Sequence, residues 1–360
     1  MTTTMQSVIN SVYKVTKKIP KNFLYNVSFY VITLGRKNYA ALARENGVSY
    51  KDVYIKNDLA LDYTEYARNY LITLINNLAT KENPGKLLVD FTAILKSFSQ
   101  QIEGVTYDYD GVTGRVQKCF SGAFVIWTNG KIWIPCGFEI WLRKKDAGDN
   151  YKTKSELVQK IICEYKKHIS FNEVILDGAF ASKAILQFFT EQGLKYTIRI
   201  PCNRVVTIDG ETHQLKNHPK LKFMRNEKYK VAEGTYKEIF NYFIAEKRTG
   251  KNNISEVVFI ISNKKRATAY DHVMAFKERW PIEKFNRSAK QHLGLGHCQS
   301  TNINKQYAHF YLVMFSYVIL QAMKYDKQEK SIEAVLHPIR RQKSMHELFQ
   351  YLDLEKTFML

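Results

Sequence analysis

The chain has 360 residues, enough for two or three domains or for one core with a large insertion. Its 54 Lys and Arg residues outnumber its 34 Asp and Glu residues, giving a formal net charge of +20 at pH 7. The surplus is spread along the chain, which favours a positive folded surface that binds a nucleic acid backbone over a merely soluble basic protein. Since no basic amphipathic helix stands apart, a membrane-surface partner is not expected.

The cysteines and the apolar runs indicate a cytoplasmic protein. The five cysteines are odd in number and show no CxxC pair, as expected in a reducing compartment. The first residues lack the apolar core of a signal peptide. The most apolar run, His309–Met323, contains Ser316 and Gln321 and is too short to span a bilayer. We expect it to be a buried helix, and the protein to be nucleoid-associated when it binds DNA.

Residues 1–82 are predicted to form a helical DNA-binding region, because apolar residues recur at helical spacing. Within it, residues 39–57 have the rhythm of a helix-turn-helix. Ala43 and Val53 fit its small and core positions, and Gly47 fits the turn that leads through Val48 to a capping Ser49.

The second helix of this motif is predicted to span Tyr50–Lys56. It would bring Tyr50, Lys51 and Tyr54 to the bases or phosphates of a major groove. Many unrelated helix pairs share this turn, so a simple packed helix pair stays open as an alternative.

A strand-rich texture begins after Asn83-Pro84-Gly85. Lys86–Leu95 is an apolar strand with Asp90 near its middle, where an acid is costly unless it is paired or binds a metal. The alternative is an aspartate that caps a turn at the strand end. Two further strands, within residues 114–128 and 131–142, flank Asn129-Gly130, a strong hairpin signal. These three strands are predicted to form an antiparallel meander.

A second acid follows the fourth predicted strand. Glu173–Phe180 is a short apolar segment in which Asp177 precedes Gly178, and a helix is expected from Ser182 to Gln192. Acids where a strand turns into a helix are favoured positions for functional sites in α/β sheets. The alternative is an aspartate that caps the following helix.

The remaining chain is divided into three parts. Residues 201–255 alternate short strands with basic turns and are predicted to be a β-rich insertion. Residues 83–200 and 256–300 form the core, which includes a buried strand at 254–262. Residues 301–360 are expected to form a helical C-terminal region.

This order of elements predicts an α/β fold with a ribonuclease H-like mixed sheet flanked by helices. In that layout the first and fourth strands are neighbours, and a late helix crosses near their ends. Asp90 and Asp177 would therefore meet a third acid from that helix.

The third acid is Glu283, in the segment 276–290. Phe276, Arg279, Glu283 and Lys290 are spaced F-x2-R-x3-E-x6-K, and on a single helix they would lie within about 60° of one another. A carboxylate between two cations suggests a metal ligand beside a polyanion. Three clustered carboxylates repel one another unless cations lie between them, which favours two Mg²⁺ or Mn²⁺ ions that bind a phosphodiester.

These residues resemble the DDE transposases of bacterial insertion sequences, in the cut-and-paste group with the pattern Y-x2-R-x3-E-x6-K. Three of its four positions match, and Phe276 replaces the tyrosine. The family's second acid stands in a context like Asp177-Gly178-Ala179-Phe180. Its first acid precedes a threonine and a lysine, as in Asp90-Phe91-Thr92 and Lys96.

The resemblance implies a metal-dependent endonuclease and polynucleotidyl transferase. Asp90, Asp177 and Glu283 would bind the two metal ions, and Arg279 and Lys290 would hold phosphates. Its partners would be double-stranded DNA, as terminal inverted repeats and as target, and a second copy of the chain. Further DNA contacts are expected from the ring and the cations of the same segment: Phe276, Lys284 and Arg287.

Other interpretations remain open. Asp108 and Asp110 are a possible metal pair, although a turn between strands is favoured. The segment with His292, His297 and Cys298 lacks a fourth zinc ligand. Trp280 is interpreted as a packing residue and Pro281 as a helix start or kink. Lys284 and Arg287 could alternatively form only a solvated helix face. The functional alternatives are a non-catalytic DNA-binding protein and a structure-specific nuclease.

Overall fold

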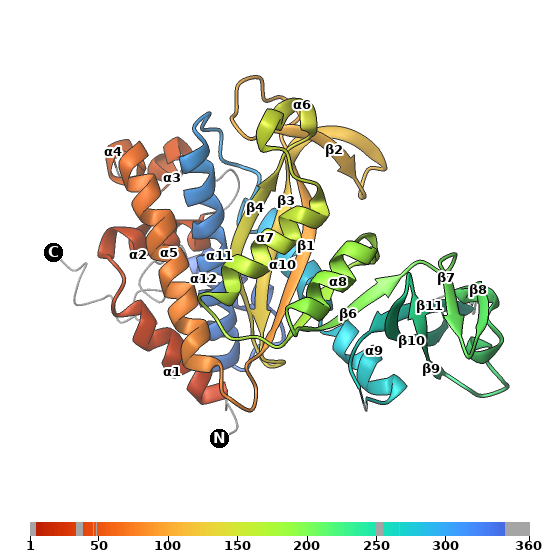
Figure 1. Ribbon diagram of the computed structural model, residues 1–360. Helices are drawn as coiled ribbons and strands as arrows, with labels where there is room; N and C mark the ends of the chain where they lie inside the picture. Colours follow the sequence, from red (N-terminus) through yellow and green to blue (C-terminus); the bar gives the residue numbers. More distant parts are fainter. Residues whose placement is uncertain are drawn as a thin grey trace.

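The computed structural model describes residues 5–33, 39–45, 47, 49–249, 255–265 and 267–342. Figure 1 shows a central sheet with a helical body on one side and a lobe of strands at the far end. All further structural statements concern these described residues.

The core of the fold is a five-stranded mixed sheet. Its strands are β1 (Lys86–Leu95), β3 (Arg115–Thr128), β4 (Trp133–Trp141), β5 (Glu173–Leu176) and β6 (Lys195–Ile200). They lie in the order β4-β3-β1-β5-β6, with β3 antiparallel to β1 and β4, and with β1, β5 and β6 mutually parallel. This arrangement is consistent with a ribonuclease H-like fold and confirms that the first and fourth predicted core strands are neighbours.

Local chemistry accounts for the hairpin between β3 and β4. Asn129 Oδ1 accepts the N–H groups of Lys131 and Ile132 at 3.1 and 3.2 Å, and Gly130 has a φ of +85°. Glycine adopts this conformation without a steric cost. The predicted Asn-Gly turn is confirmed.

One short strand was not predicted. β2 (Thr106–Asp110) pairs with the first half of β3. Asp110 accepts the N–H groups of Val112 and Thr113, which confirms a turn role for this residue. Asp108 instead lies within the strand and pairs with Lys154 at 2.6 Å.

The predicted β-rich insertion extends the core sheet. β11 (Ser255–Ser262) pairs antiparallel with β6, and the sheet continues through four further strands to a total of eleven. These are β10 (Ile239–Thr249), β9 (Tyr229–Tyr236), β7 (Val205–Ile208) and β8 (Glu211–Gln214). Residues 250–254, part of the predicted insertion and its next strand, lie outside the described residues. In Figure 1 this extension forms the lobe that carries α9 (Ala269–Lys277).

The helical body surrounds α11 (Ile303–Asp326). This helix contacts β4 and the N-terminal helices, and every residue from His309 to Met323 is buried. The predicted buried helix is confirmed. No described helix has the length and apolarity needed to cross a membrane. The other helices of this body are α1 (Met5–Thr16), α2 (Lys21–Ile32), α3 (Tyr39–Glu45), α4 (Tyr50–Val53), α5 (Asn57–Leu78) and α12 (Ile332–Gln342). The final predicted helical residues, 343–360, lie outside the described part.

The remaining helices lie along the core. α7 (Lys154–Lys166) packs against β4, where Tyr165 donates a hydrogen bond to the carbonyl of Cys136 at 3.0 Å. α8 (Lys183–Glu191) packs beside α7, α6 (Lys144–Ala147) follows β4, and α10 (Trp280–Gln291) crosses the core beside α11.

The predicted second helix of the helix-turn-helix is wrong in length. Gly47 has a φ of +63° and Ser49 Oγ accepts the N–H of Lys51, as expected of the turn and the cap. Val48 lies outside the described residues. However, α4 ends at Val53, and Tyr54 is extended with φ −77° and ψ 120°. A single helical turn is too short to lie in a major groove as a recognition helix.

Candidate active site

The register of the sheet brings Asp90 and Asp177 together. Val89 of β1 pairs with Leu176 of β5, and an aspartate follows each residue of that pair. Because side chains alternate along a strand and neighbouring strands lie about 4.8 Å apart, the two aspartates lie side by side. The two aspartates are far apart in the sequence, but the parallel pairing of β1 and β5 makes them neighbours.

Both structural alternatives for these aspartates are excluded. Asp90 lies in the middle of β1 and pairs with Phe124 of β3, so it is not at a strand end. Asp177 makes no side-chain capping bond to the turn that follows, and Ser182 caps α8 through the N–H of Ile185.

The segment with Glu283 forms two helices, so the predicted single helix is wrong. α9 ends at Lys277, and α10 begins at Trp280 with Pro281 in its first turn. Proline is favoured there because its missing N–H has no partner within the helix. Pro281 therefore starts α10, as expected. Phe276 lies on α9 and is 7% exposed.

Arg279 holds two of the three acids. Its Nη2 donates to Glu283 Oε1 at 2.7 Å, and its Nη1 donates to Asp90 Oδ1 at 3.4 Å. The side chains of Arg279 and Asp90 are each 17% exposed, whereas that of Glu283 is 41% exposed. A planar guanidinium can contact two carboxylates at once, and this one links α10 to β1.

The pKa of Asp90 is affected by both other acids. Burial raises the pKa of Asp90 to about 6, Arg279 opposes the increase, and the charges of Asp177 and Glu283 add to it. The three predicted acids thus share one electrostatic environment.

The other predicted residues lie at different distances from this centre. Lys290 Nζ donates to Thr92 Oγ1 at 3.1 Å and to the Ala93 carbonyl at 3.0 Å, which ties α10 to β1 just beyond Asp90. Lys284 and Arg287 line a separate cavity against α11 and α12. Tyr50 and Lys51 lie on α4 in the helical body.

The donor chemistry of the three acids fits a hard divalent cation. Carboxylate oxygens are the ligands that Mg²⁺ and Mn²⁺ prefer, and a cation would relieve the repulsion felt by Asp90. Within the described residues, no three acidic, histidine or cysteine side chains are already arranged as a metal site. The cation that Asp90 and Glu283 share here is the guanidinium of Arg279.

A second cavity, of about 610 Å³, adjoins Arg279 and Glu283 and extends toward the strand lobe. Arg199 and Arg248 come from β6 and β10, and Lys277 from α9. No sequence motif marks these cations, because only the pairing of β6, β11 and β10 gathers them. The rest of the lining is Val258, Phe276, Arg279, Trp280 and Glu283.

Trp280 also differs from its predicted packing role, because 57% of its surface is exposed. Its ring lines the second cavity beside Glu283. The adjacent Pro281 was the only local sequence signal near Trp280. It predicts where a helix starts and not whether the Trp280 ring is exposed.

Two protein-family models match the chain. A sequence model described as a transposase DDE domain matches residues 147–319, and a model of the DDE superfamily endonucleases matches residues 55–230. Both matches support a DDE-type transposase. A search of curated proteins found no match.

The two matches overlap on residues 147–230. The endonuclease match includes Asp90 and Asp177, and the transposase match includes Asp177 and Glu283. The narrower group with the Tyr-Arg-Glu-Lys pattern stays a prediction.

Proposed function

We propose that this protein is a DNA transposase that binds the ends of a mobile element and catalyses metal-dependent phosphodiester cleavage and strand transfer. Asp90, Asp177 and Glu283 are its proposed catalytic residues. The observation that carries the proposal is the convergence of acids from β1, the end of β5 and α10 around one arginine. A fold alone supports many functions, whereas this site supports phosphoryl transfer.

The three carboxylates would hold two Mg²⁺ or Mn²⁺ ions. When bound, such ions lower the pKa of an attacking water or 3′-hydroxyl and stabilise the charge on the leaving oxygen. The side chains of this chain position the DNA and supply electrostatic stabilisation without a covalent nucleophile.

Arg279 is proposed to bind a DNA phosphate once the acids hold metal ions. Its guanidinium has donors enough for both a carboxylate and a phosphate. Lys290 is proposed to lie beside that phosphate while it holds Thr92 and Ala93 of β1. The guanidinium of Arg279 lies over the ring of Phe276, with its carbon 5.8 Å from the centre of that ring.

The cavity beside the acids is proposed to accept the DNA strand. Arg199, Arg248 and Lys277 provide charge for the backbone, and the exposed ring of Trp280 provides a stacking surface for a base. The net charge of +20 supports the same partner.

The biological setting is inferred from the resemblance. The DNA partners would be terminal inverted repeats and a target duplex, a homodimer would pair two ends, and the protein would act at the nucleoid in the cytoplasm. Tyr50 and Lys51 remain proposed DNA contacts from the helical N-terminal region, with less support because α4 is a single turn.

Two alternatives are separated by experiment. A non-catalytic DNA-binding protein has no use for a buried Asp90 whose pKa is raised by burial and further by the charges of two neighbouring acids, and this favours an enzyme. A structure-specific nuclease would cleave DNA but would not join it.

The test is a strand-transfer assay with oligonucleotides that carry the flanking terminal repeats, with and without Mg²⁺. Wild type is expected to cleave the ends and to join them to a target, whereas Glu283→Gln does neither. Equal products from the two proteins would refute the catalytic assignment, and cleavage without joining would favour the nuclease.

A further inference from the structure

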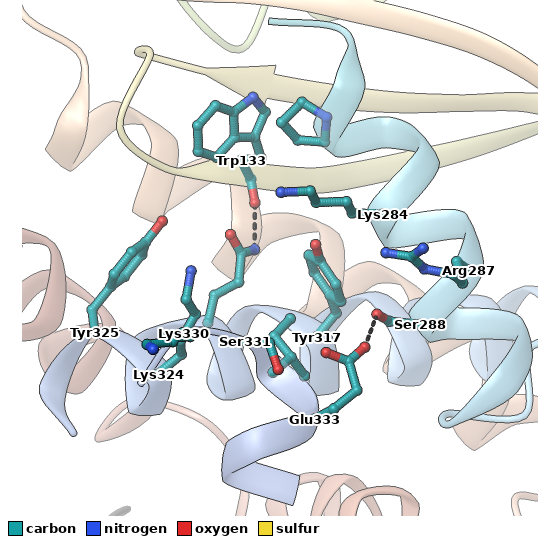
Figure 2. A pocket seen from close by; sticks show the side chains of 13 residues that line it. Trp133, Lys284, Arg287, Ser288, Tyr317, Lys324, Tyr325, Lys330, Ser331 and Glu333 are labelled. Carbon is teal, nitrogen blue, oxygen red and sulfur yellow. Dashed lines mark hydrogen bonds between the residues drawn. The ribbon is translucent and has the colours of Figure 1, made fainter. Parts of the chain in front are cut away.

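The separate cavity lined by Lys284 and Arg287 measures about 240 Å³ and lies on the side of α10 that faces α11 and α12. Figure 2 shows that Lys284 and Arg287 extend toward it from α10, while Lys324 and Lys330 lie across it. Lys324 lies near the end of α11, and Lys330 lies in the loop before α12. Four cations from three segments thus surround one small space.

Within the described residues this positive charge is compensated only in part, by Glu333. None of the four cations forms an ion pair there, although Lys324 Nζ lies 5.1 Å from the centre of the Tyr325 ring. The acidic residue in the wall, Glu333, instead accepts a hydrogen bond from Ser288 at 3.0 Å and lies 3.7 Å from His292. Burial, and then the charge of Lys284, lowers the pKa of Lys324, while the charge of Glu333 opposes the decrease. An added anion would offset this repulsion.

Three uncharged polar side chains of the wall, those of Trp133, Gln321 and Tyr325, already have partners. Trp133 Nε1 donates to the Glu278 carbonyl at 3.3 Å, and Tyr325 Oη donates to the Lys131 carbonyl at 2.9 Å. Gln321 Nε2 donates to the Trp133 carbonyl at 2.6 Å. Besides the Tyr317 hydroxyl, the donors left for a ligand are the cationic side chains, which suit an anionic group with several oxygens.

The volume of the cavity limits the size of the group that enters it. Small-molecule pockets usually measure about 300–1,000 Å³, so this cavity has room for one phosphate and part of its sugar. A phosphate that belongs to a longer chain fits this limit, because the rest of that chain would remain outside.

We propose that this cavity binds one backbone phosphate of DNA, with Lys324 and Lys330 acting together with Lys284 and Arg287. The inference rests on the proposed function, because α10 presents Glu283 to the acids and Lys284 to this cavity. DNA bound at the candidate active site would thus be held a second time, by the C-terminal helices. The contact is independent of base sequence, since the cations reach a phosphate only.

The test measures binding separately from cleavage. A short fluorescein-labelled duplex is titrated in EDTA at several salt concentrations with wild type and with the double variant Lys324→Gln/Lys330→Gln. The matched control is Lys160→Gln/Lys167→Gln, which removes the same charge from exposed positions on and after α7. The plot of log K against log salt is expected to become shallower by about 0.9 in the cavity variant only.

Equal changes in both double variants would overturn the proposal, because net charge alone would then explain them. Free phosphate is the other source of the same chemistry. If inorganic phosphate raises the Tm of wild type but not of the cavity variant, and DNA binding is the same in both, DNA is not the ligand. The variant Lys324→Arg/Lys330→Arg is expected to restore the salt slope. EDTA prevents metal-dependent chemistry, so the binding assay does not depend on catalysis. If wild type neither cleaves nor joins DNA, but the salt slope still becomes shallower in the cavity variant only, the proposed function is refuted and the phosphate site is not.

Discussion

Arg279 and Glu283 lie one helical turn apart and form an ion pair of 2.7 Å at the start of α10. The same guanidinium reaches Asp90 of β1 at 3.4 Å. Arg279 therefore provides a positive charge that Asp90 and Glu283 share.

Replacing Arg279 by glutamine is expected to tighten the binding of Mn²⁺. A divalent ion must compete with the guanidinium for Asp90 and Glu283, and partly exposed ion pairs contribute about 0.5–1 kcal/mol, or about two- to fivefold in Kd. Isothermal titration calorimetry measures the change. Lys277→Gln is the control, since Lys277 lines the same cavity but pairs with Glu246 at 2.9 Å. Weaker or unchanged Mn²⁺ binding in Arg279→Gln would contradict the competition.

Lys290→Met is expected to destabilise the fold by about 1 kcal/mol, because it removes hydrogen bonds to Thr92 and Ala93. Urea unfolding measures the free energy. Lys284→Met on the same helix, which has no such bond within the described residues, should stay within about 0.5 kcal/mol of wild type. Equal losses in the two variants would argue against an anchoring role for Lys290.

Gly85→Ala is expected to destabilise the protein more than Gly130→Ala. Both glycines have a positive φ, +90° and +85°, so alanine is strained at either position. At Gly85 a Cβ would also lie 2.4 Å from Trp127 Nε1, whereas at Gly130 nothing lies within 4 Å. The clash should add about 1–3 kcal/mol, measured by denaturant unfolding. Indistinguishable stabilities would show that the Trp127 ring adapts freely.

Acid should destabilise the protein through His309. Burial lowers the pKa of His309 from its usual 6.5 to about 3, so the folded state disfavours the proton. Its Nδ1 accepts from Tyr30 Oη at 2.7 Å, and its Nε2 donates to the Gly294 carbonyl at 2.9 Å. The unfolded chain binds a proton below about pH 6.5, so the stabilisation is complete above that pH and is lost as pH falls toward about 3.

The check compares unfolding free energies at pH 7.5 and pH 5 for wild type and His309→Gln. The glutamine has no titrating proton, so its loss of stability between the two pH values should be smaller. The same loss in both proteins would assign the acid sensitivity to other groups.

The core sheet and the acids could be predicted because local patterns and chain order point the same way. An acid in an apolar strand at Asp90 and an acid before a glycine at Asp177 are visible in the sequence. The parallel pairing of β1 and β5 then makes these residues neighbours. The Asn-Gly hairpin has a similarly local cause.

The errors arose where tertiary context decides. A single helix over 276–290 was predicted, but Pro281 has no N–H to continue the hydrogen bonds of α9. The segment therefore breaks into α9, which ends at Lys277, and α10, which begins at Trp280. The recognition helix was predicted too long: Tyr54 is extended, and Lys305 Nζ of α11 lies 4.0 Å from the centre of its ring. Arg199 and Arg248 could not be assigned, since only the assembled sheet brings them to one cavity.

The central claim is that Asp90, Asp177 and Glu283 act together in metal-dependent DNA cleavage. Asp177 tests it most directly, because this acid takes part in no ion pair within the described residues, and its change leaves the Arg279 contacts intact. The matched control is Asp108→Asn on β2, at the other acid weighed as a metal ligand.

The measurement is the single-turnover rate of Mg²⁺-dependent cleavage at the terminal repeat. Asp177→Asn is expected to lower the rate by about 10³-fold or more, while Asp108→Asn stays within a few-fold of wild type. A wild-type rate for Asp177→Asn would contradict the account.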